Sequence, residues 1–134
     1  MQEENFKNQK PKLLIVEDDK ITVDVLKMYL GKIFELDWAI SGDEALKKAV
    51  ASDYDGFLMD IGLPGSMNGM EATKSLKKIK NYRDKPFIAI TAYAMKGDKQ
   101  RFLSEGLTHY IVKPFNKQEL LSTVAEALKI EVDK

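Results

Sequence analysis

The chain has 134 residues, of which 44% are hydrophobic and 31% are charged, and its 21 acidic side chains balance its 21 basic ones. These values describe one soluble domain with a single core. Zero net charge argues against nucleic acid as a partner, because affinity for polyanions comes mainly from Lys and Arg that neutralise phosphates. The lack of cysteine excludes disulfides and thiolate sites, and a single histidine, His109, excludes a His-rich metal site.

The sequence contains no apolar stretch near the roughly 18 residues that a membrane-spanning helix needs. Residues 1–10 are polar throughout, so the chain starts without the charged and then apolar segment of an export signal. We therefore expect neither a membrane as partner nor export, and we expect a cytoplasmic location.

The first half of the chain alternates strand and helix patterns. Leu13–Val16 is an unbroken apolar run, typical of a strand covered on both faces. Leu36–Ile40 alternates apolar and polar side chains, which predicts an edge strand. Ser41 opens the next helix with the spacing of a capping box. Between the two strands, a helix from Lys20 to Leu30 is expected to bury some of its apolar side chains: Ile21, Val25, Leu26, Met28 and Tyr29.

The second half repeats this pattern. Further unbroken apolar runs predict three strands: Phe57–Met59, Phe87–Ile90 and Tyr110–Val112. Three more helices are predicted by Ala72, Leu76 and Ile79 on one face, by the segment from about Met95 to Glu105, and by a final stripe of Leu120, Leu121, Val124 and Leu128. Five strand and helix pairs with short connections predict an α/β domain whose parallel sheet has helices on both faces.

Polar residues follow the predicted buried strands. In parallel α/β sheets ligands bind beyond the carboxyl ends of the strands, so these residues should converge at one edge. Each one alone has a plainer interpretation, such as a strand-end hydroxyl or a surface lysine, but together they indicate a site. They are Glu17-Asp18-Asp19 after the first run, Asp60 after the third, Thr91 after the fourth and Lys113 after the fifth.

Three of these residues are acids that would repel one another. Two carboxylates about 4 Å apart at an effective dielectric near 20 repel by roughly 4 kcal/mol. A divalent cation relieves this repulsion, and hard oxygen donors suit Mg²⁺. We interpret Glu17, Asp18 and Asp60 as a Mg²⁺ site, with the alternative that Asp18 or Asp19 only caps the next helix.

The chemistry that fits this set is transfer of a phosphoryl group onto a carboxylate. Asp60 can supply the attacking oxygen, while Glu17 and Asp18 can hold the metal. Thr91 can donate its hydroxyl to the transferred group, and Lys113 can place a positive charge beside it.

These residues resemble the receiver domain of two-component response regulators, over about Lys12 to Leu128. The resemblance implies a flavodoxin-like, doubly wound sheet of five parallel strands in the order 2-1-3-4-5, with five helices. We expect the receiver domain over residues 11–130, a flexible leader over 1–10 and a tail over 131–134. The motifs that carry the resemblance are Leu13–Asp19, Met59–Pro64, Ile90–Ala92 and Val112–Phe115.

The resemblance also implies a role for each site residue. Asp60 matches the phospho-acceptor, Asp18 the direct Mg²⁺ ligand and Glu17 its companion, and the backbone carbonyl of Gly62 matches a third metal contact. Thr91 and Tyr110 match the two switch positions. Lys113 matches the lysine that pairs with the phosphoryl group, and its bond to Pro114 is expected to be cis.

By the same resemblance the chain is a phospho-acceptor that assists its own phosphorylation and dephosphorylation, not an enzyme. Its expected partners are a sensor histidine kinase or histidine phosphotransfer protein, and a downstream protein. The downstream protein would bind the face of the fourth helix, fifth strand and fifth helix. Candidate contacts on that face are Met95, Lys96, Arg101, Lys117 and Gln118.

One alternative function is a Mg²⁺-dependent phosphoester hydrolase at the same edge of the sheet. It would need a further acid–base group and a substrate pocket, and the chain has no spare histidine. A flavodoxin-type cofactor carrier would need a first loop rich in Gly, Ser and Thr, where this chain has Glu17-Asp18-Asp19. The chain is expected either to act alone by binding a partner or to belong to a longer regulator or hybrid kinase.

Overall fold

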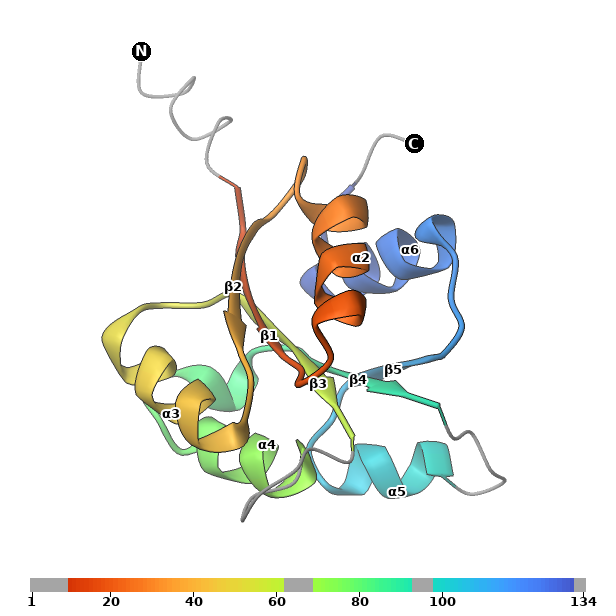
Figure 1. Ribbon diagram of the computed structural model, residues 1–134. Helices are drawn as coiled ribbons and strands as arrows, with labels where there is room; N and C mark the ends of the chain where they lie inside the picture. Colours follow the sequence, from red (N-terminus) through yellow and green to blue (C-terminus); the bar gives the residue numbers. More distant parts are fainter. Residues whose placement is uncertain (1–9, 62–68, 93–97, 132–134) are drawn as a thin grey trace.

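The computed structural model describes residues 10–61, 69–92 and 98–131 (Figure 1). Five parallel strands form one sheet in the order β2-β1-β3-β4-β5, which confirms the order expected from the sequence. The described residues contain five α-helices, as expected, and one short 3₁₀ helix, η1. The elements are β1 (Lys12–Val16), α2 (Lys20–Leu30), β2 (Glu35–Ala39), α3 (Gly42–Ala51), β3 (Gly56–Asp60), α4 (Gly69–Lys77), η1 (Tyr82–Asp84), β4 (Phe87–Thr91), α5 (Asp98–Ser104), β5 (His109–Val112) and α6 (Lys117–Leu128).

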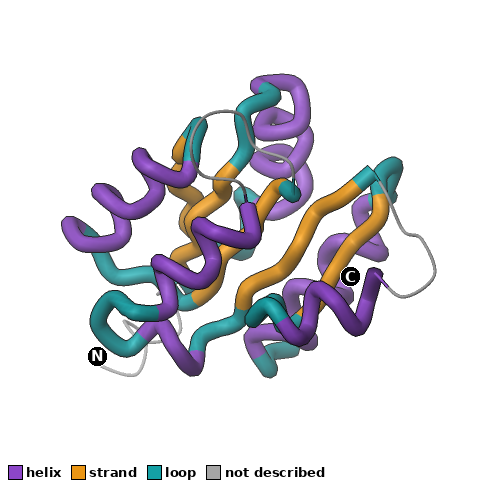
Figure 2. Tube along the Cα trace, turned by 90° about the horizontal axis from the view of Figure 1, so that it is seen from below, coloured by secondary structure: helices purple, strands orange, loops and turns teal. Residues whose placement is uncertain are grey.

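The sheet separates two apolar cores, and successive side chains of each strand point into opposite ones. In β1, Leu13 and Ile15 join the core under α2 and α6. Leu14 and Val16 join the core under α3, α4 and α5. Figure 2 shows the strands between these two helical layers. Burial on both faces is why β1, β3 and β4 have unbroken apolar sequences.

The core under α3 and α4 is rich in aromatic rings at the amino ends of its strands. Phe57 and Phe87 stack with ring centroids 4.4 Å apart and planes 6° apart. Tyr82 meets Phe57 edge-on with centroids 5.0 Å apart, and its hydroxyl donates to the carbonyl of Ser52 at 2.7 Å. These contacts fix the end of the sheet opposite the predicted site.

Side-chain caps begin three of the described helices that follow strands, and in α6 the cap is Asn116, whose Oδ1 accepts from the Glu119 amide at 2.8 Å. Asp19 caps α2, its carboxylate accepting from the Ile21 amide at 3.2 Å. Ser41 caps α3, its hydroxyl accepting from the Glu44 amide at 3.2 Å, as the capping box predicts. In a capping box the glutamate accepts in return from the amide of the cap residue. Here Glu44 Oε1 accepts from the amide of Ile40, one residue before Ser41, at 3.0 Å.

The extent of α2 is as predicted, and the face that it buries agrees in part with the prediction. Val23, Leu26 and Leu30 are buried in the core. Ile21 and Met28, two of the five candidates for burial, are 74% and 68% exposed. The expected face was therefore only partly correct.

Two other predicted helices differ from the structure at their ends. α4 ends at Lys77, so Ile79 packs against the core from the turn after the helix rather than from the helix itself. α5 is described from Asp98, while the predicted start near Met95 lies outside the described residues. The helix ends two residues before Gly106, whose φ of 104° is readily adopted only by glycine.

Most of the predicted leader and tail lies outside the described residues, so those boundaries stay predictions. Among the described residues, no helix has the length and apolar character required to cross a membrane.

Candidate functional site

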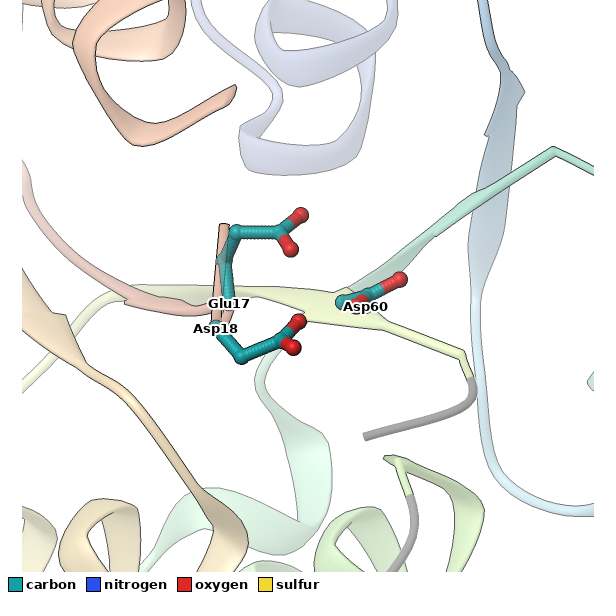
Figure 3. A group of neighbouring side chains, drawn as sticks. All are labelled: Glu17, Asp18 and Asp60. Atoms are coloured by element: carbon teal, nitrogen blue, oxygen red, sulfur yellow. The ribbon is translucent and has the colours of Figure 1, made fainter. Parts of the chain in front are cut away.

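The parallel sheet brings three acids together at the carboxyl ends of β1 and β3. Val16 of β1 pairs with Met59 of β3, so the next residues, Glu17 and Asp60, are neighbours. Carboxylate oxygens of Glu17, Asp18 and Asp60 lie within 4.8 Å of one another (Figure 3). Glu17 and Asp60 are buried, with 1% and 9% of their surface exposed, and Asp18 is exposed. We refer to these three residues as the acidic cluster.

Main-chain and side-chain contacts hold Glu17 in this position. The amide of Asp19 donates to Glu17 Oε2 at 3.2 Å, so the cap residue of α2 also supports the cluster. The amide of Glu17 donates to the carbonyl of Ala39 at 3.0 Å. The indole Nε1 of Trp38 donates to the carbonyl of Glu17 at 2.6 Å.

Lys113 comes directly after β5 and brings a positive charge to the cluster. Its Nζ lies 3.4 Å from Glu17 Oε1 and 3.9 Å from Asp60 Oδ1. Its amide donates to the carbonyl of Thr91 at 2.7 Å, which ties the end of β5 to that of β4. The bond between Lys113 and Pro114 is cis, as expected.

The charges at the cluster do not balance. Burial raises the pKa of Asp60 to about 7, and the neighbouring negative charge of Glu17 adds to this, while Lys113 acts in the opposite direction. Three carboxylates beside one ammonium group leave excess negative charge in a partly buried place. The donor chemistry therefore fits a hard divalent cation such as Mg²⁺, which binds one or two carboxylates and keeps several waters.

Thr91 lies on β4, the strand next to β3, and Tyr110 lies on β5, the next strand along the sheet. Thr91 ends β4, next to β3, and only 1% of its surface is exposed. Tyr110 pairs with Ala89 of β4, two residues before Thr91, so the side chains of Thr91 and Tyr110 lie on one face of the sheet. The Tyr110 ring is half-buried and meets Phe102 of α5, with centroids 6.3 Å apart.

The remaining predicted residues are the metal contact at Gly62 and the candidate contacts of the protein-binding face. Gly62, Met95 and Lys96 lie outside the described residues. Arg101 is exposed on α5, and Lys117 and its neighbour Gln118 are exposed at the start of α6.

The single histidine lies away from the acidic cluster. His109 begins β5, whereas Lys113 follows the end of that strand. Its Nε2 lies 3.7 Å from a carboxylate oxygen of Glu126, on α6. This position agrees with the absence of a role for His109 in the predicted chemistry.

Two residues that support the site were not identified from the sequence. Trp38 bonds to the backbone of Glu17, and its only sequence signal is that it is the one tryptophan, on a predicted edge strand. Gly69 begins α4 against β3, where an added Cβ would lie 2.2 Å from the carbonyl oxygen of Asp60. The sequence indicated this contact only by placing a glycine nine residues after Asp60.

The fold and the cluster together define a class: a flavodoxin-like α/β protein with an acidic cation site at the carboxyl edge of its sheet. The family model of the response regulator receiver domain matches residues 13–125. The chain belongs to this family and is therefore a receiver domain of two-component signalling, not an enzyme in the conventional sense.

Similar curated proteins include single receivers and large kinases. The polar-differentiation response regulator DivK of Brucella ovis is 37% identical over 117 residues, which cover 87% of this chain and 94% of DivK. The hybrid signal transduction histidine kinase I of Dictyostelium discoideum is 36% identical over 84% of this chain, but the match covers 7% of that kinase. The autoinducer 2 sensor kinase/phosphatase LuxQ of Vibrio vulnificus is 38% identical over 81% of this chain and 13% of LuxQ. The chain thus spans a small part of these two kinases.

Solved structures confirm the fold. The chemotaxis protein CheY4 of Vibrio cholerae has a TM-score of 0.83 and 29% identity, covering 89% of this chain and 99% of CheY4. The receiver domain of the sensor histidine kinase PA1611 of Pseudomonas aeruginosa has a TM-score of 0.81 and 30% identity, covering 90% of this chain and 99% of that domain. That structure contains a magnesium ion coordinated in its active-site cleft.

Proposed function

We propose that this chain accepts a phosphoryl group on Asp60 from a histidine of a partner protein and thereby switches a protein-binding face. The observation that carries the proposal is the acidic cluster with Lys113 Nζ 3.9 Å from Asp60 Oδ1. In this arrangement a carboxylate oxygen of Asp60 lies close to two further carboxylates and to the ammonium group of Lys113, which supports the proposal.

The proposed reaction is a displacement at phosphorus. A carboxylate oxygen of Asp60 forms the new P–O bond, and the P–N bond to the partner's histidine breaks. The electron pair of the broken bond stays on the imidazole, which takes up a proton. Lys113 compensates negative charge on the transferred group, and the buried hydroxyl of Thr91 donates to one of its oxygens.

We assign the cation site to Asp18 and Asp60 as direct ligands, with Glu17 as their companion. Bound Mg²⁺ would neutralise charge on the equatorial phosphoryl oxygens. The magnesium ion in the related receiver of PA1611 supports this assignment. The carbonyl of Gly62, outside the described residues, stays a proposed third contact from the protein.

Phosphorylation would act on the face formed by α5, β5 and α6, the fourth helix, fifth strand and fifth helix of the sequence prediction. A phosphoryl group adds close to two negative charges and three acceptor oxygens. Thr91 would move toward those oxygens, and Tyr110, on the same face of the sheet, would move inward. A downstream protein would bind the altered face through exposed residues such as Arg101, Lys117 and Gln118.

The partner that supplies the phosphoryl group would be a sensor histidine kinase or a histidine phosphotransfer protein. The similarity to kinases such as LuxQ and to DivK supports this pairing. We further propose that the receiver domain spans residues 11–130, between a leader and a short tail, and that it acts in the cytoplasm.

The experiment that tests the proposal is incubation with a small phosphodonor and Mg²⁺, followed by intact-mass measurement. The parent chain should gain one phosphoryl group, the gain should require Mg²⁺, and Asp60→Asn should show none. Equal phosphorylation of Asp60→Asn would refute the assignment of Asp60.

The hydrolase alternative has less support. His109, the only histidine, lies at the amino end of β5 and contacts Glu126, so it is not placed to act as an acid–base group at the cluster. Turnover of generic phosphoesters by the parent chain, and not by Asp60→Asn, would favour the hydrolase.

A further inference from the structure

Both backbone polar groups of Glu17, its amide and its carbonyl, form hydrogen bonds to residues of the edge strand β2. The amide of Glu17 donates to the carbonyl of Ala39 at 3.0 Å, continuing the pairing of β1 with β2. The carbonyl of Glu17 accepts from the indole Nε1 of Trp38 at 2.6 Å. A tryptophan side chain therefore bonds to the backbone at the point where β1 leads into the acidic cluster.

This carbonyl belongs to the peptide group that joins Glu17 to Asp18. The orientation of that peptide sets the directions in which both side chains leave the backbone. Both carboxylates must lie close to Asp60, within 4.8 Å, although like charges repel. The hydrogen bond to this shared peptide limits its rotation. It therefore keeps the carboxylates of Glu17 and Asp18 near Asp60, although their charges repel one another when no cation is bound.

Trp38 is itself held by the two helices beside β2. The Nζ of Lys27, on α2, lies 5.7 Å from the centroid of the indole ring, close enough for a cation–π interaction. Lys48, on α3, donates to the Trp38 carbonyl. The ring also packs against the core under α2 and α6. A donor that is already fixed loses little further freedom when it orders its acceptor.

We propose that Trp38 is a positioning residue for the cation site. Its indole N–H orients the peptide between Glu17 and Asp18, so that the acidic cluster binds Mg²⁺ more tightly than it would without this hydrogen bond. The inference rests on the proposed function, since it takes Mg²⁺ as the cation. Groups that orient metal ligands commonly change metal affinity by about tenfold or more when they are removed.

The test is Trp38→Phe, which keeps an aromatic ring and removes the N–H donor. Calorimetric titration with Mg²⁺ should show affinity about tenfold weaker than in the parent chain. Phosphorylation by a small phosphodonor should need proportionally more Mg²⁺ for half-saturation. At saturating Mg²⁺ its rate should stay within about twofold, because the reacting groups are intact.

Lys27→Met is the matched control, since it removes the charge beside the same ring and keeps the N–H bond. Lys27 is only one of the supports of the ring, and the packing against the core and the Lys48 contact remain, so this variant should weaken Mg²⁺ affinity by less than Trp38→Phe, by no more than about twofold. If Trp38→Phe and the parent bind Mg²⁺ equally, the role of Trp38 is refuted while the proposed function stands. If the parent itself binds no Mg²⁺, both are refuted.

A second measurement uses the parent chain and does not depend on the folding of a variant. Trp38 is the only tryptophan, so its indole N–H gives one NMR signal. This signal should shift during Mg²⁺ titration with the same midpoint as calorimetry. An indole signal that stays unchanged at saturating Mg²⁺ would overturn the proposal.

Discussion

The carboxyl group of Asp60 is affected by burial, by the negative charge of Glu17 and by the positive charge of Lys113. Burial and the charge of Glu17 raise its pKa from the usual 3.8 to about 7, against the opposing effect of Lys113. Near neutral pH and without metal, ionisation of Asp60 in the folded chain therefore lowers the free energy of unfolding. A bound cation or the loss of the charge would relieve this destabilisation.

We predict that Asp60→Asn stabilises the metal-free chain at alkaline pH. Because the folded pKa is raised, the folded parent binds more protons than the unfolded chain between about pH 4 and pH 7, and its stability falls as pH rises through that window. The variant lacks this fall. At pH 8 with a chelator we expect a gain of about 2 kcal/mol, roughly half of the value for the full shift, because water reaches the carboxylate.

Urea unfolding of both chains at pH 4 and pH 8 measures this effect. The difference should nearly vanish at pH 4, and Mg²⁺ at pH 8 should reduce it by stabilising the parent. Asp24→Asn, an exposed acid on α2 paired with Lys20, is the control and should change stability by less than about 0.5 kcal/mol. Identical unfolding of the parent and Asp60→Asn at pH 8 would contradict the charge argument.

At this scale the sequence predicted residues whose side chains act directly. Asp60 and Lys113 each follow an apolar run, and the rule that strand ends converge was sufficient to bring them together. Trp38 acts through a backbone carbonyl, and which carbonyl its ring reaches depends on how the edge strand packs. No pattern of residue types contains that information.

At the scale of elements, the contact between α4 and β3 constrains the position of Asp60. Gly69 lies so close to β3 that a Cβ would come within 2.2 Å of the Asp60 carbonyl oxygen and 3.3 Å of the Ile61 Cα. Because these are backbone atoms, a side chain at Gly69 requires the strand or the helix to move.

We predict that Gly69→Ala destabilises the chain and weakens its Mg²⁺ site together. The forced backbone shift should cost about 1 to 3 kcal/mol in urea unfolding. Calorimetry should show weaker Mg²⁺ binding, because the shift displaces Asp60 from the acidic cluster.

Gly56→Ala is the matched glycine variant. Its added Cβ would meet side-chain carbons of Leu13, Leu128 and Pro86 at 3.1 to 3.3 Å, which can adjust by a few tenths of an ångström. We expect a smaller loss of stability and unchanged Mg²⁺ affinity. If Gly69→Ala kept both properties, the contact with Asp60 would have no bearing on the site.

Helix α2 shows what periodicity can and cannot predict about an element. Its ends, Lys20 and Leu30, were predicted correctly. Its buried face was predicted only in part: Leu26 is buried, but Ile21 and Met28 are exposed although they are as apolar as the residues that face the sheet, because packing decides which apolar side chains are covered. Val23, which is buried, was absent from the predicted face.

At the scale of the whole molecule, the strand order followed from short connections, parallel strands and the resemblance to receivers. The same reasoning predicted that the acids and the lysine share one edge of the sheet. The identity of the partner proteins could not be predicted from the sequence, because exposed residues such as Arg101, Lys117 and Gln118 can contact many different protein surfaces.

We predict that phosphorylation changes the environment of one side of the molecule. Amide NMR signals should shift from Thr91 through Tyr110 to Glu119, since Thr91 lies on β4 beside β3, the strand that ends at Asp60, and Tyr110 lies on β5 beside β4. Spectra recorded with Mg²⁺, with and without a small phosphodonor, measure this.

The internal reference is the opposite end of the sheet. Signals of Ser52, Tyr54 and Tyr82 should stay in place, because their hydrogen bonds and ring contacts lie at the amino ends of the strands. Superimposable spectra over residues 91–119 would show that no switch passes through this face.

The stacked rings of Phe57 and Phe87 have one more consequence. They lie about 10 Å along the strands from Asp60, given a rise of roughly 3.3 Å per residue. Toward the other end, the same layer contains Met59 and the small Ala89. Bulky stacked rings therefore fill one end of this layer, and smaller or more flexible side chains fill the end nearer the site, so a substitution near Met59 or Ala89 leaves the ring stack intact.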